Sequence, residues 1–280
     1  MFPCHESALR TLCYSDIFDY PLTRSEIENY QIGTNKIPIS PKYVEKKGIY
    51  YFLKGRKKIV EWRKKREMWS NQKLERSGRL ARFLTLIPTV KLIAVTGAVA
   101  AGNARQDDDI DLMIVTSRGW IWTTRFLTIL LAEILGVRRR PHSSDLKDML
   151  CFNMFMDEDH VSVPSNERDL FSANEVVRVK ILWGKKETIA RFWRTNRWIK
   201  EFLPNYKLPI RNSEKELYTN YDSRILEKLF RWLQLRYMRR RRTSEVISDG
   251  YLRFHPRDAR TWILTAYRAR LKKYGINDII

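Results

Sequence analysis

The sequence is poor in cysteine, glycine and proline. Its 280 residues include 3 Cys, 11 Gly and 10 Pro. An odd cysteine count with no CxxC pair and no Cys/His cluster argues against a disulfide framework and against a structural zinc site. The low glycine and proline content favours long helices over a turn-rich β-sandwich.

The sequence also lacks an uninterrupted hydrophobic run. The most apolar stretch, residues 120–137, is broken by Arg125 and Glu133. A buried helix explains it better than a membrane span does. Residues 1–10 show no basic region followed by an apolar run, so they do not predict a signal peptide. We therefore expect a protein with no membrane span, located in the cytoplasm.

Acidic residues are in short supply. The chain has 53 Lys and Arg against 32 Asp and Glu, for a net charge of +21. A protein this basic attracts polyanions, which include RNA, DNA, nucleotides and acidic membrane surfaces. Hydrophobic residues make up 44% and aromatic residues 12%. That content excludes disorder of the whole chain and is ample for a core.

The N-terminal part resembles a small α+β module. A helix is expected over 5–19, and Thr23 with Glu26 three residues later forms a capping-box pattern for a second helix. A third short helix is expected to begin near Ser40 and Pro41. The β-like run 48–53 follows, and Gly55 after it could turn a hairpin. This outline predicts a winged-helix-like module over 1–55, joined to a basic connector helix over 56–88.

The next segment changes character. The pattern predicts, in order, a short apolar strand (90–95), a turn of small residues (96–103), a second strand (112–115), a buried helix (120–135) and a third strand (149–156). This order predicts an α/β sheet as the core of residues 89–165. We expect residues 166–280 to be helical, with helices over 167–182, 186–202, 213–242 and 256–273. The fold class is therefore α/β, mostly helical overall.

The segment before the second strand is unusually acidic for this chain. Carboxylates occupy positions 107, 108, 109 and 111. Like charges this close raise each other's pKa unless a cation lies between them. On a strand the side chains of Asp109 and Asp111 point to the same face, where they could hold Mg²⁺ or Mn²⁺ through oxygen. The alternative is a polar hairpin turn whose acids point into solvent.

The run VTGAVAAGNARQDDDIDLMIV resembles the signature of the DNA polymerase beta-like nucleotidyltransferase superfamily. Gly97 matches the glycine of that signature, and Asp109 and Asp111 match its metal-binding pair. The resemblance is specific over 90–116 and extends loosely to about residue 156. The layout is also similar to that of bacterial nucleotidyltransferase-domain proteins with an N-terminal winged-helix-like segment. It implies a small mixed sheet, an NTP substrate, Mg²⁺ (or Mn²⁺), and nucleotide contacts from Thr96, Gly97, Ala98 and Gly102.

Two positions depart from this signature. The serine that usually follows the glycine is Ala98 here, so a hydroxyl contact to the phosphates is lost. The third carboxylate of the family lies on a later strand, where this chain offers Asn153, with acids only at 157–159 beyond it. An asparagine can bind a cation through its carbonyl oxygen but is not a base. Asn153 is therefore our third catalytic candidate, and full activity is in question.

Basic clusters lie near both ends of the chain. We expect Lys57, Lys58, Lys64 and Lys65, together with Arg239, Arg240 and Arg241, to contact nucleic-acid phosphates. The alternative is that they form ordinary solvated helix faces.

Three functions remain open. The first is an enzyme that transfers a nucleoside monophosphate from an NTP to a hydroxyl of RNA, a small molecule or a protein, with release of pyrophosphate. The second is a catalytically weakened protein of the same fold that binds RNA or DNA. The third is one half of a toxin–antitoxin pair.

Overall fold

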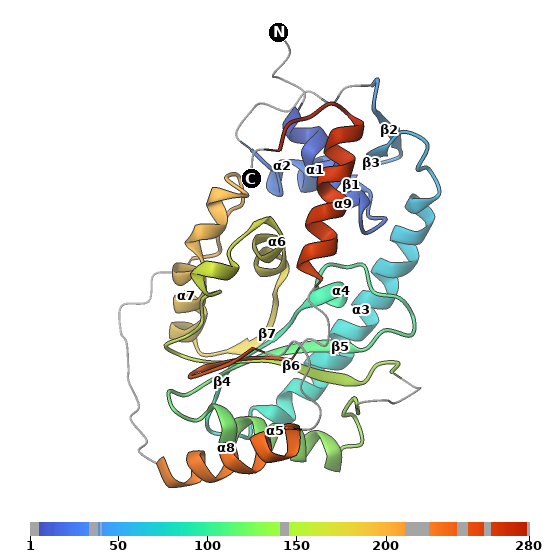
Figure 1. Cartoon of the computed structure of the whole chain (residues 1–280). Helices are drawn as coiled ribbons and strands as arrows, with labels where there is room; N and C mark the ends of the chain where they lie inside the picture. The colour runs from blue at the N-terminus through green and yellow to red at the C-terminus, as the bar shows by residue number, and fades with distance from the viewer. Residues whose placement is uncertain are drawn as a thin grey trace.

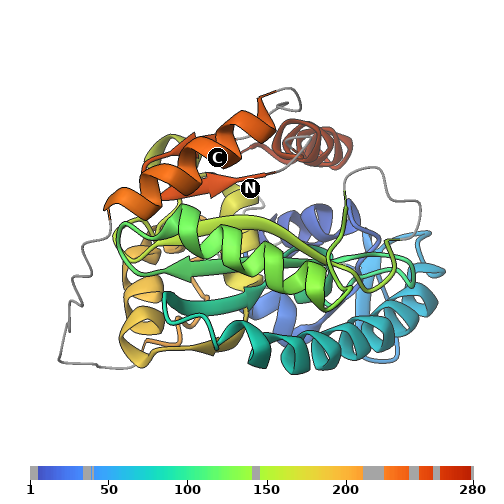
Figure 2. The same ribbon diagram turned by 90° about the horizontal axis from the view of Figure 1, so that it is seen from below.

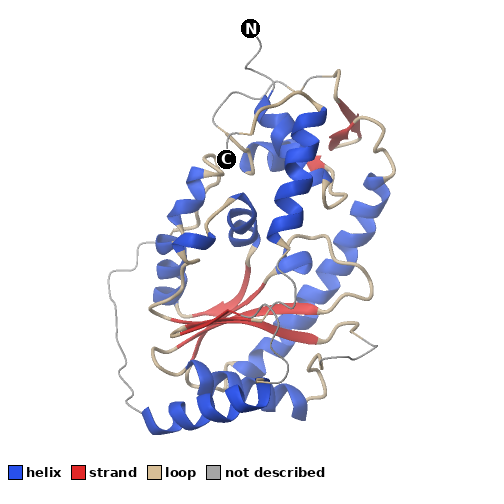
Figure 3. Cartoon of the chain, in the orientation of Figure 1, coloured by secondary structure: helices blue, strands red, loops and turns tan. Residues whose placement is uncertain are grey.

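The computed structural model shows a mixed α/β protein with two β-sheets (Figures 1 and 3). The residues that it describes are 6–33, 39, 41–140, 146–210, 224–239, 246–254 and 259–278.

The larger sheet has six strands in the order β7-β4-β5-β6-β9-β8. Strands β5 and β6 are parallel, and all other neighbours in the sheet are antiparallel. The mixed sheet expected from the sequence is therefore present. Its strands are β4 (Val90–Val95), β5 (Ile110–Thr116), β6 (Leu150–Asp157), β7 (Lys180–Gly184), β8 (Val246–Ser248) and β9 (Tyr251–Arg253).

The smaller sheet is N-terminal and has the order β1-β3-β2. It accompanies two helices, and the capping box of Thr23 and Glu26 at the start of the second one is confirmed. The elements are α1 (Glu6–Asp16), β1 (Leu22–Thr23), α2 (Arg24–Asn29), β2 (Val44–Lys47) and β3 (Tyr50–Leu53).

Two expectations for this module are wrong. Residues 41–43 form a turn that leads into β2, so no helix starts at Pro41; Ser40 lies outside the described residues. The hairpin turn precedes the run 50–53 rather than following it at Gly55, because Gly48 adopts a positive φ of 61° between β2 and β3. Glycine takes that conformation without steric cost, so it fixes the turn there. The division of the chain at 55, 88 and 165 stays a prediction.

Helices cover both faces of the six-stranded sheet (Figures 1 and 2). On one face lie α3 (Ile59–Leu84), α5 (Ile121–Ile134) and α8 (Arg224–Met238). On the other lie α6 (Leu170–Arg178), α7 (Lys186–Thr195) and α9 (Arg260–Lys273), and α1 packs against the small sheet and α9. The long helix α3 corresponds to the connector helix expected over 56–88 and is shorter than expected by a few residues at each end.

Strand β5 supplies both faces by simple alternation. Ile110, Leu112 and Ile114 belong to the apolar cluster shared with α3 and α5. Met113 and Val115 belong to the other cluster, which extends from α1 to α9. Because the side-chain period of a strand is two, Asp111 projects to the same side as Met113.

The region 166–280 is not wholly helical. The helix expected over 167–182 ends at Arg178, and residues 180–184 form β7, which pairs with β4 at an edge of the sheet. Residues 246–253 form a hairpin around Asp249 and Gly250, whose φ is 78°. An Asp-Gly pair between β-branched and aromatic residues is a strong hairpin signal, which the helical interpretation overlooked. The helix expected over 186–202 is divided into α7 and the short 3-10 helix η2 (Arg197–Glu201), and a further 3-10 helix, η1 (Ser165–Glu167), precedes α6.

Within the described residues, no helix combines the length and the hydropathy needed to cross a membrane. The apolar helix expected over 120–135 is α5, which has 14 residues and packs between the sheet and α8.

Candidate metal and ligand site

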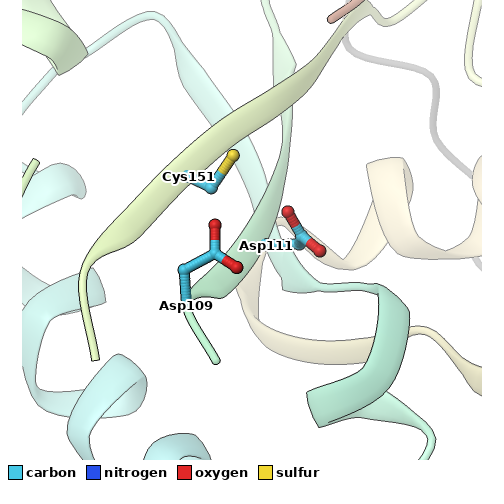
Figure 4. Close-up of side chains that lie close together, drawn as sticks. All are labelled: Asp109, Asp111 and Cys151. Carbon is cyan, nitrogen blue, oxygen red and sulfur yellow. The ribbon is translucent and has the colours of Figure 1, made fainter. Parts of the chain in front are cut away.

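Asp109 and Asp111 lie side by side at the start of β5 (Figure 4). Cys151 on β6 is the strand partner of Asp111, and one ligand atom from each of the three side chains lies within 4.8 Å of the others. This group could hold a metal ion. The aspartates are the pair that the sequence singled out; the thiol beside them was not expected.

The loop that leads to Asp109 is fixed by α3. The Lys73 ammonium donates hydrogen bonds to the backbone oxygens of Gln106 (3.0 Å) and Asp108 (2.7 Å). Asp108 also accepts from the Arg105 N–H at 2.7 Å, so it holds its own loop rather than facing the site. Of the acidic residues in this run, Asp108 therefore stabilises the loop, whereas Asp109 and Asp111 form the candidate site.

The turn after β4 touches Asp111 directly. The Thr96 N–H donates to the Asp111 backbone oxygen at 3.0 Å. Gly97 has a φ of +64°, and a Cβ atom there would lie 2.8 Å from the Asp111 Oδ2. Both the backbone conformation and the lack of space require glycine at this position.

Asp111 has a strongly perturbed carboxyl group. Its pKa is raised from 3.8 to about 7, first because burial disfavours the charged form and second because Asp109 repels it. A hydrogen bond from Cys151 and the charge of Arg139 lower the pKa in part. Burial also raises the pKa of the Cys151 thiol, which therefore stays protonated. Perturbed groups of this kind concentrate at functional sites.

Arg139 neutralises the other aspartate. Its Nη1 lies 2.7 Å from the Asp109 Oδ2 and donates to the Cys151 Sγ at 3.4 Å. Its neighbours Arg138 and Arg140 both pair with Glu133 instead. In the structure, an arginine thus supplies the cation that the two aspartates require.

A cavity of about 290 Å³ opens beside Asp111. Thr96, Gly97 and Asn153 line it as well, so four of the residues predicted from the sequence meet at one place. The rest of its wall is largely apolar and comes from α6, α9 and the sheet.

Asn153 lies where β6 bulges. Leu112 pairs with Phe152 and Met113 with Met154, so Asn153 is the extra residue in β6. It is 3% exposed, and its Oδ1 has no hydrogen-bond partner within the described part of the chain. A buried, unsatisfied oxygen is rare and points to a missing ligand atom or water.

Two predicted nucleotide contacts lie outside this cavity. Ala98 is exposed and lines a neighbouring cavity of about 150 Å³. Gly102 lines neither cavity; it follows α4 (Gly97–Ala100), and its N–H donates to the Val99 oxygen. Asp157 and Asp159, the acids beyond Asn153, are engaged with His160, Arg118 and Arg191.

Glu175 was not predicted from the sequence. This residue of α6 lines both cavities, and burial raises the pKa of its carboxyl group, while Arg178 lowers it in part. No hydrogen bond or ion pair joins it to another residue of the described chain. The only available signal was its place in the helix, because Ser172 and Val176, three before and one after, also line the large cavity.

A charged network closes one side of the cavity. Arg253 binds Glu167 at 3.1 Å, and Arg260 binds Asp169 at 2.9 Å. These arginines are therefore committed to acids of the chain.

The basic clusters separate by residue type. Arg63 and Arg66 turn inward to Glu26 and Asn103, whereas Lys57, Lys58, Lys64 and Lys65 are exposed. Arg239 is exposed, and Arg240 and Arg241 lie outside the described residues. Nucleic-acid contact by these groups stays a prediction.

Comparison with known proteins adds little. No protein-family model matches the sequence, and no curated protein matches it. A solved structure described as "Crystal structure of the toxin-antitoxin with AMP-PNP" is 20% identical, with a TM-score of 0.23, over 45% of this chain and 81% of that chain. At that TM-score the similarity does not establish a shared fold.

Proposed function

We propose that the protein is a metal-dependent nucleotidyltransferase. The observation that supports this best is the contact between the Gly97 turn and Asp111, with Asp109 alongside. A glycine turn can bring backbone N–H groups against phosphates, and the two carboxylates can hold the metal ion that accompanies a triphosphate. The reaction transfers a nucleoside monophosphate from an NTP to an acceptor hydroxyl.

The donor atoms fit magnesium. Mg²⁺ prefers carboxylate oxygens and retains several waters, so Asp109 and Asp111 suffice, and the protonated thiol of Cys151 is not required. When bound, the ion would stabilise charge on the phosphates and lower the pKa of the attacking hydroxyl. Asp111 would hold such an ion in its deprotonated form, and Asp109 would hold it through the oxygen that Arg139 now contacts.

The other residues have narrower roles. Thr96 and the Gly97 backbone would orient the phosphates, and Ala98 offers no hydroxyl to help them. Asn153 would contribute a neutral oxygen and cannot take a proton from the acceptor. We therefore propose that transfer is slow or selective compared with that of an enzyme with three carboxylates.

Calorimetric titration of Mg²⁺–ATP and Mg²⁺–CTP tests the proposal. Wild type should bind nucleotide, and Asp111→Asn should not, because one of the two metal ligands is lost. The matched control is Asp107→Asn, which removes an exposed charge from the same loop. Asn153→Asp should tighten metal binding. Equal binding by wild type and Asp111→Asn would refute the site.

Transfer itself is tested by labelling. Each α-labelled NTP is incubated with the protein, Mg²⁺ and either total RNA or cell lysate. Label should appear on an acceptor with wild type and not with Asp111→Asn. Label transfer that persists in the variant would contradict the assignment.

A second candidate function is RNA or DNA binding. The observation in its favour is that Lys57, Lys58, Lys64 and Lys65 remain exposed, while the arginines of the same stretch turn inward. Exposed lysines bind phosphate without reading sequence, so affinity should fall steeply with salt. Replacing all four with glutamate should weaken binding to unrelated sequences equally; salt-independent binding would exclude it.

A further inference from the structure

Glu175 is a carboxylate that has no hydrogen-bond or ion-pair partner among the described residues. It lies between the 290 Å³ cavity and the smaller one beside the Gly97 turn. Carboxylates shielded from solvent are normally paired, so this half-buried one indicates a ligand group that the described residues do not provide.

The charged groups of the large cavity that have no ion-pair partner among the described residues are acidic. Arg253 and Arg260 are held by Glu167 and Asp169. The other polar side chains that line the cavity include the carboxylates of Asp111 and Glu175 and the Oδ1 of Asn153, which has no partner within the described residues. Donors there come from Thr96, Tyr251 and Trp262. In a chain of net charge +21, this cavity thus has a surplus of acidic groups.

Part of the cavity wall is aromatic and apolar. Phe18 and Trp262 both line the cavity and meet edge to face, with ring centroids 6.5 Å apart. Phe171 and Ile263 add to the same surface. Aromatic rings bury apolar groups and also attract cations through their faces.

We infer that this cavity binds a small organic cation, namely a protonated amine that also carries a hydroxyl on a mostly apolar body, and that this molecule is the acceptor in the transfer. The second part rests on the proposed function; the binding site does not. The ammonium donates to Glu175, the apolar body lies on the aromatic wall, and a further donor of the ligand reaches Asn153.

The electrostatics of Glu175 agree with this occupant. Burial raises the pKa of its carboxyl group, and Arg178 offsets that effect only in part. An ammonium in the cavity would supply the missing positive charge. A polynucleotide acceptor would instead bring phosphates towards the Glu175 carboxylate, which like-charge repulsion opposes.

A charge series on one scaffold tests the site. Calorimetry in an amine-free buffer compares tryptamine (cation), tryptophol (neutral) and indole-3-propionate (anion), which share the indole body. Tryptamine should bind about tenfold more tightly than tryptophol, the difference expected of a charge-assisted hydrogen bond, and the anion should bind worst. Equal affinities for the cation and the neutral molecule would overturn the inference.

Variants then locate the cation. Glu175→Gln should bring tryptamine to the affinity of tryptophol and leave tryptophol unchanged. Glu187→Gln, which removes the same charge from an exposed position on α7, is the matched control and should change neither. Asn153→Leu should weaken tryptamine and tryptophol alike, because both carry a donor. An unchanged preference for tryptamine in Glu175→Gln would place the cation elsewhere and refute the site.

Titration of Mg²⁺–ATP into the same samples separates this inference from the proposed function. If the three indole compounds bind with the expected order of affinities and the nucleotide does not bind, the amine site is supported and the transfer reaction is refuted. If the nucleotide binds and the charge series is flat, the transfer reaction stands and the amine site falls.

Discussion

The two faces of the six-stranded sheet are made by alternate residues of the same strand, yet they differ in composition and in packing. On the face towards α3 and α5, Ile110, Leu112 and Ile114 are almost completely buried among apolar neighbours. On the other face, Asp111 precedes Met113 beside a cavity that contains unpaired oxygens. One strand therefore contributes to a close-packed core and to a polar site.

The two faces contribute to the free energy of unfolding with opposite sign. Apolar burial on the α3 face adds to the free energy of unfolding, whereas a buried carboxylate with a raised pKa subtracts from it. Sites that break the local rules of folding are the places where function is expected. The predictions below change one face at a time.

The largest effect concerns Asp111 and pH. The pKa of its carboxyl group is about 7 in the folded protein, against an ordinary value of 3.8. Between these values the folded protein keeps a proton that the unfolded chain has released, so stability falls as the pH rises from about 4 to about 7. Without divalent ions, Asp111→Asn should exceed wild type by up to about 4 kcal/mol at pH 8.

Urea unfolding at pH 4, 6 and 8 in the presence of a chelator measures this difference. The gap between Asp111→Asn and wild type should open only above pH 4, and Mg²⁺ should narrow it by stabilising wild type alone. Asp107→Asn, the exposed control, should follow wild type. Parallel pH curves for all three proteins would show that Asp111 is not a destabilising buried acid.

The opposite face should respond in the opposite way. Leu112→Ala removes a side chain that is 1% exposed and should lower the free energy of unfolding by about 3 kcal/mol. Mg²⁺–nucleotide affinity, measured well below the unfolding temperature, should stay within twofold of wild type. A large loss of affinity would mean that the two faces are coupled.

Period-two patterning explains why the sequence predicted this division. The run from Asp109 to Val115 identified both the strand and the face that carries the acids, because alternation is a local property. Gly97 was predicted from the same local pattern. The contact that fixes it, with Asp111, joins residues from two separate segments and was visible only in the structure.

Other parts of the site depend on tertiary contacts. In the sequence, Glu175 cannot be distinguished from other acidic residues of helices, because its place at the cavity depends on how α6 packs on the sheet. Arg139 likewise cannot be distinguished from Arg138 and Arg140, because its contact with Asp109 joins separate segments. The strand β7 was missed because a short run, KILWG, follows a helix directly and needs the edge of β4 to define it. Pairing partners distant in sequence decide such segments, not propensity.

Gly97 connects the turn after β4 to the polar face. It is constrained both by its positive φ and by its close approach to Asp111, and comparison with Gly119 separates the two effects. Gly119 has a similar φ of +69°, and a Cβ atom there would meet nothing within 4 Å, whereas at Gly97 a Cβ atom would meet Asp111. Gly119→Ala should cost about 1 kcal/mol through backbone strain alone. Gly97→Ala should cost about 2 kcal/mol, because the aspartate must also move.

Divalent-ion affinity is the second measurement for this pair. Gly119→Ala should leave it unchanged, and Gly97→Ala should weaken it, since the displaced carboxylate is a proposed ligand. If both variants lose the same stability and neither changes metal binding, the close approach has no role at the site.

The smallest expected effect tests whether Arg139 stands in for a metal ion on the polar face. Its guanidinium occupies one oxygen of Asp109 at 2.7 Å and adds a positive charge beside the pair. Arg139→Gln removes that competition, so Mg²⁺ should bind about threefold more tightly at low salt; the partial exposure of the arginine keeps the effect modest. Arg138→Gln, whose arginine binds Glu133, is the matched control and should leave the affinity unchanged. Weaker Mg²⁺ binding in Arg139→Gln would mean that the arginine orients Asp109 for the metal rather than competing with it. The side chains of the polar face would then be held in place for ligand binding, as those of the apolar face are held in place by packing.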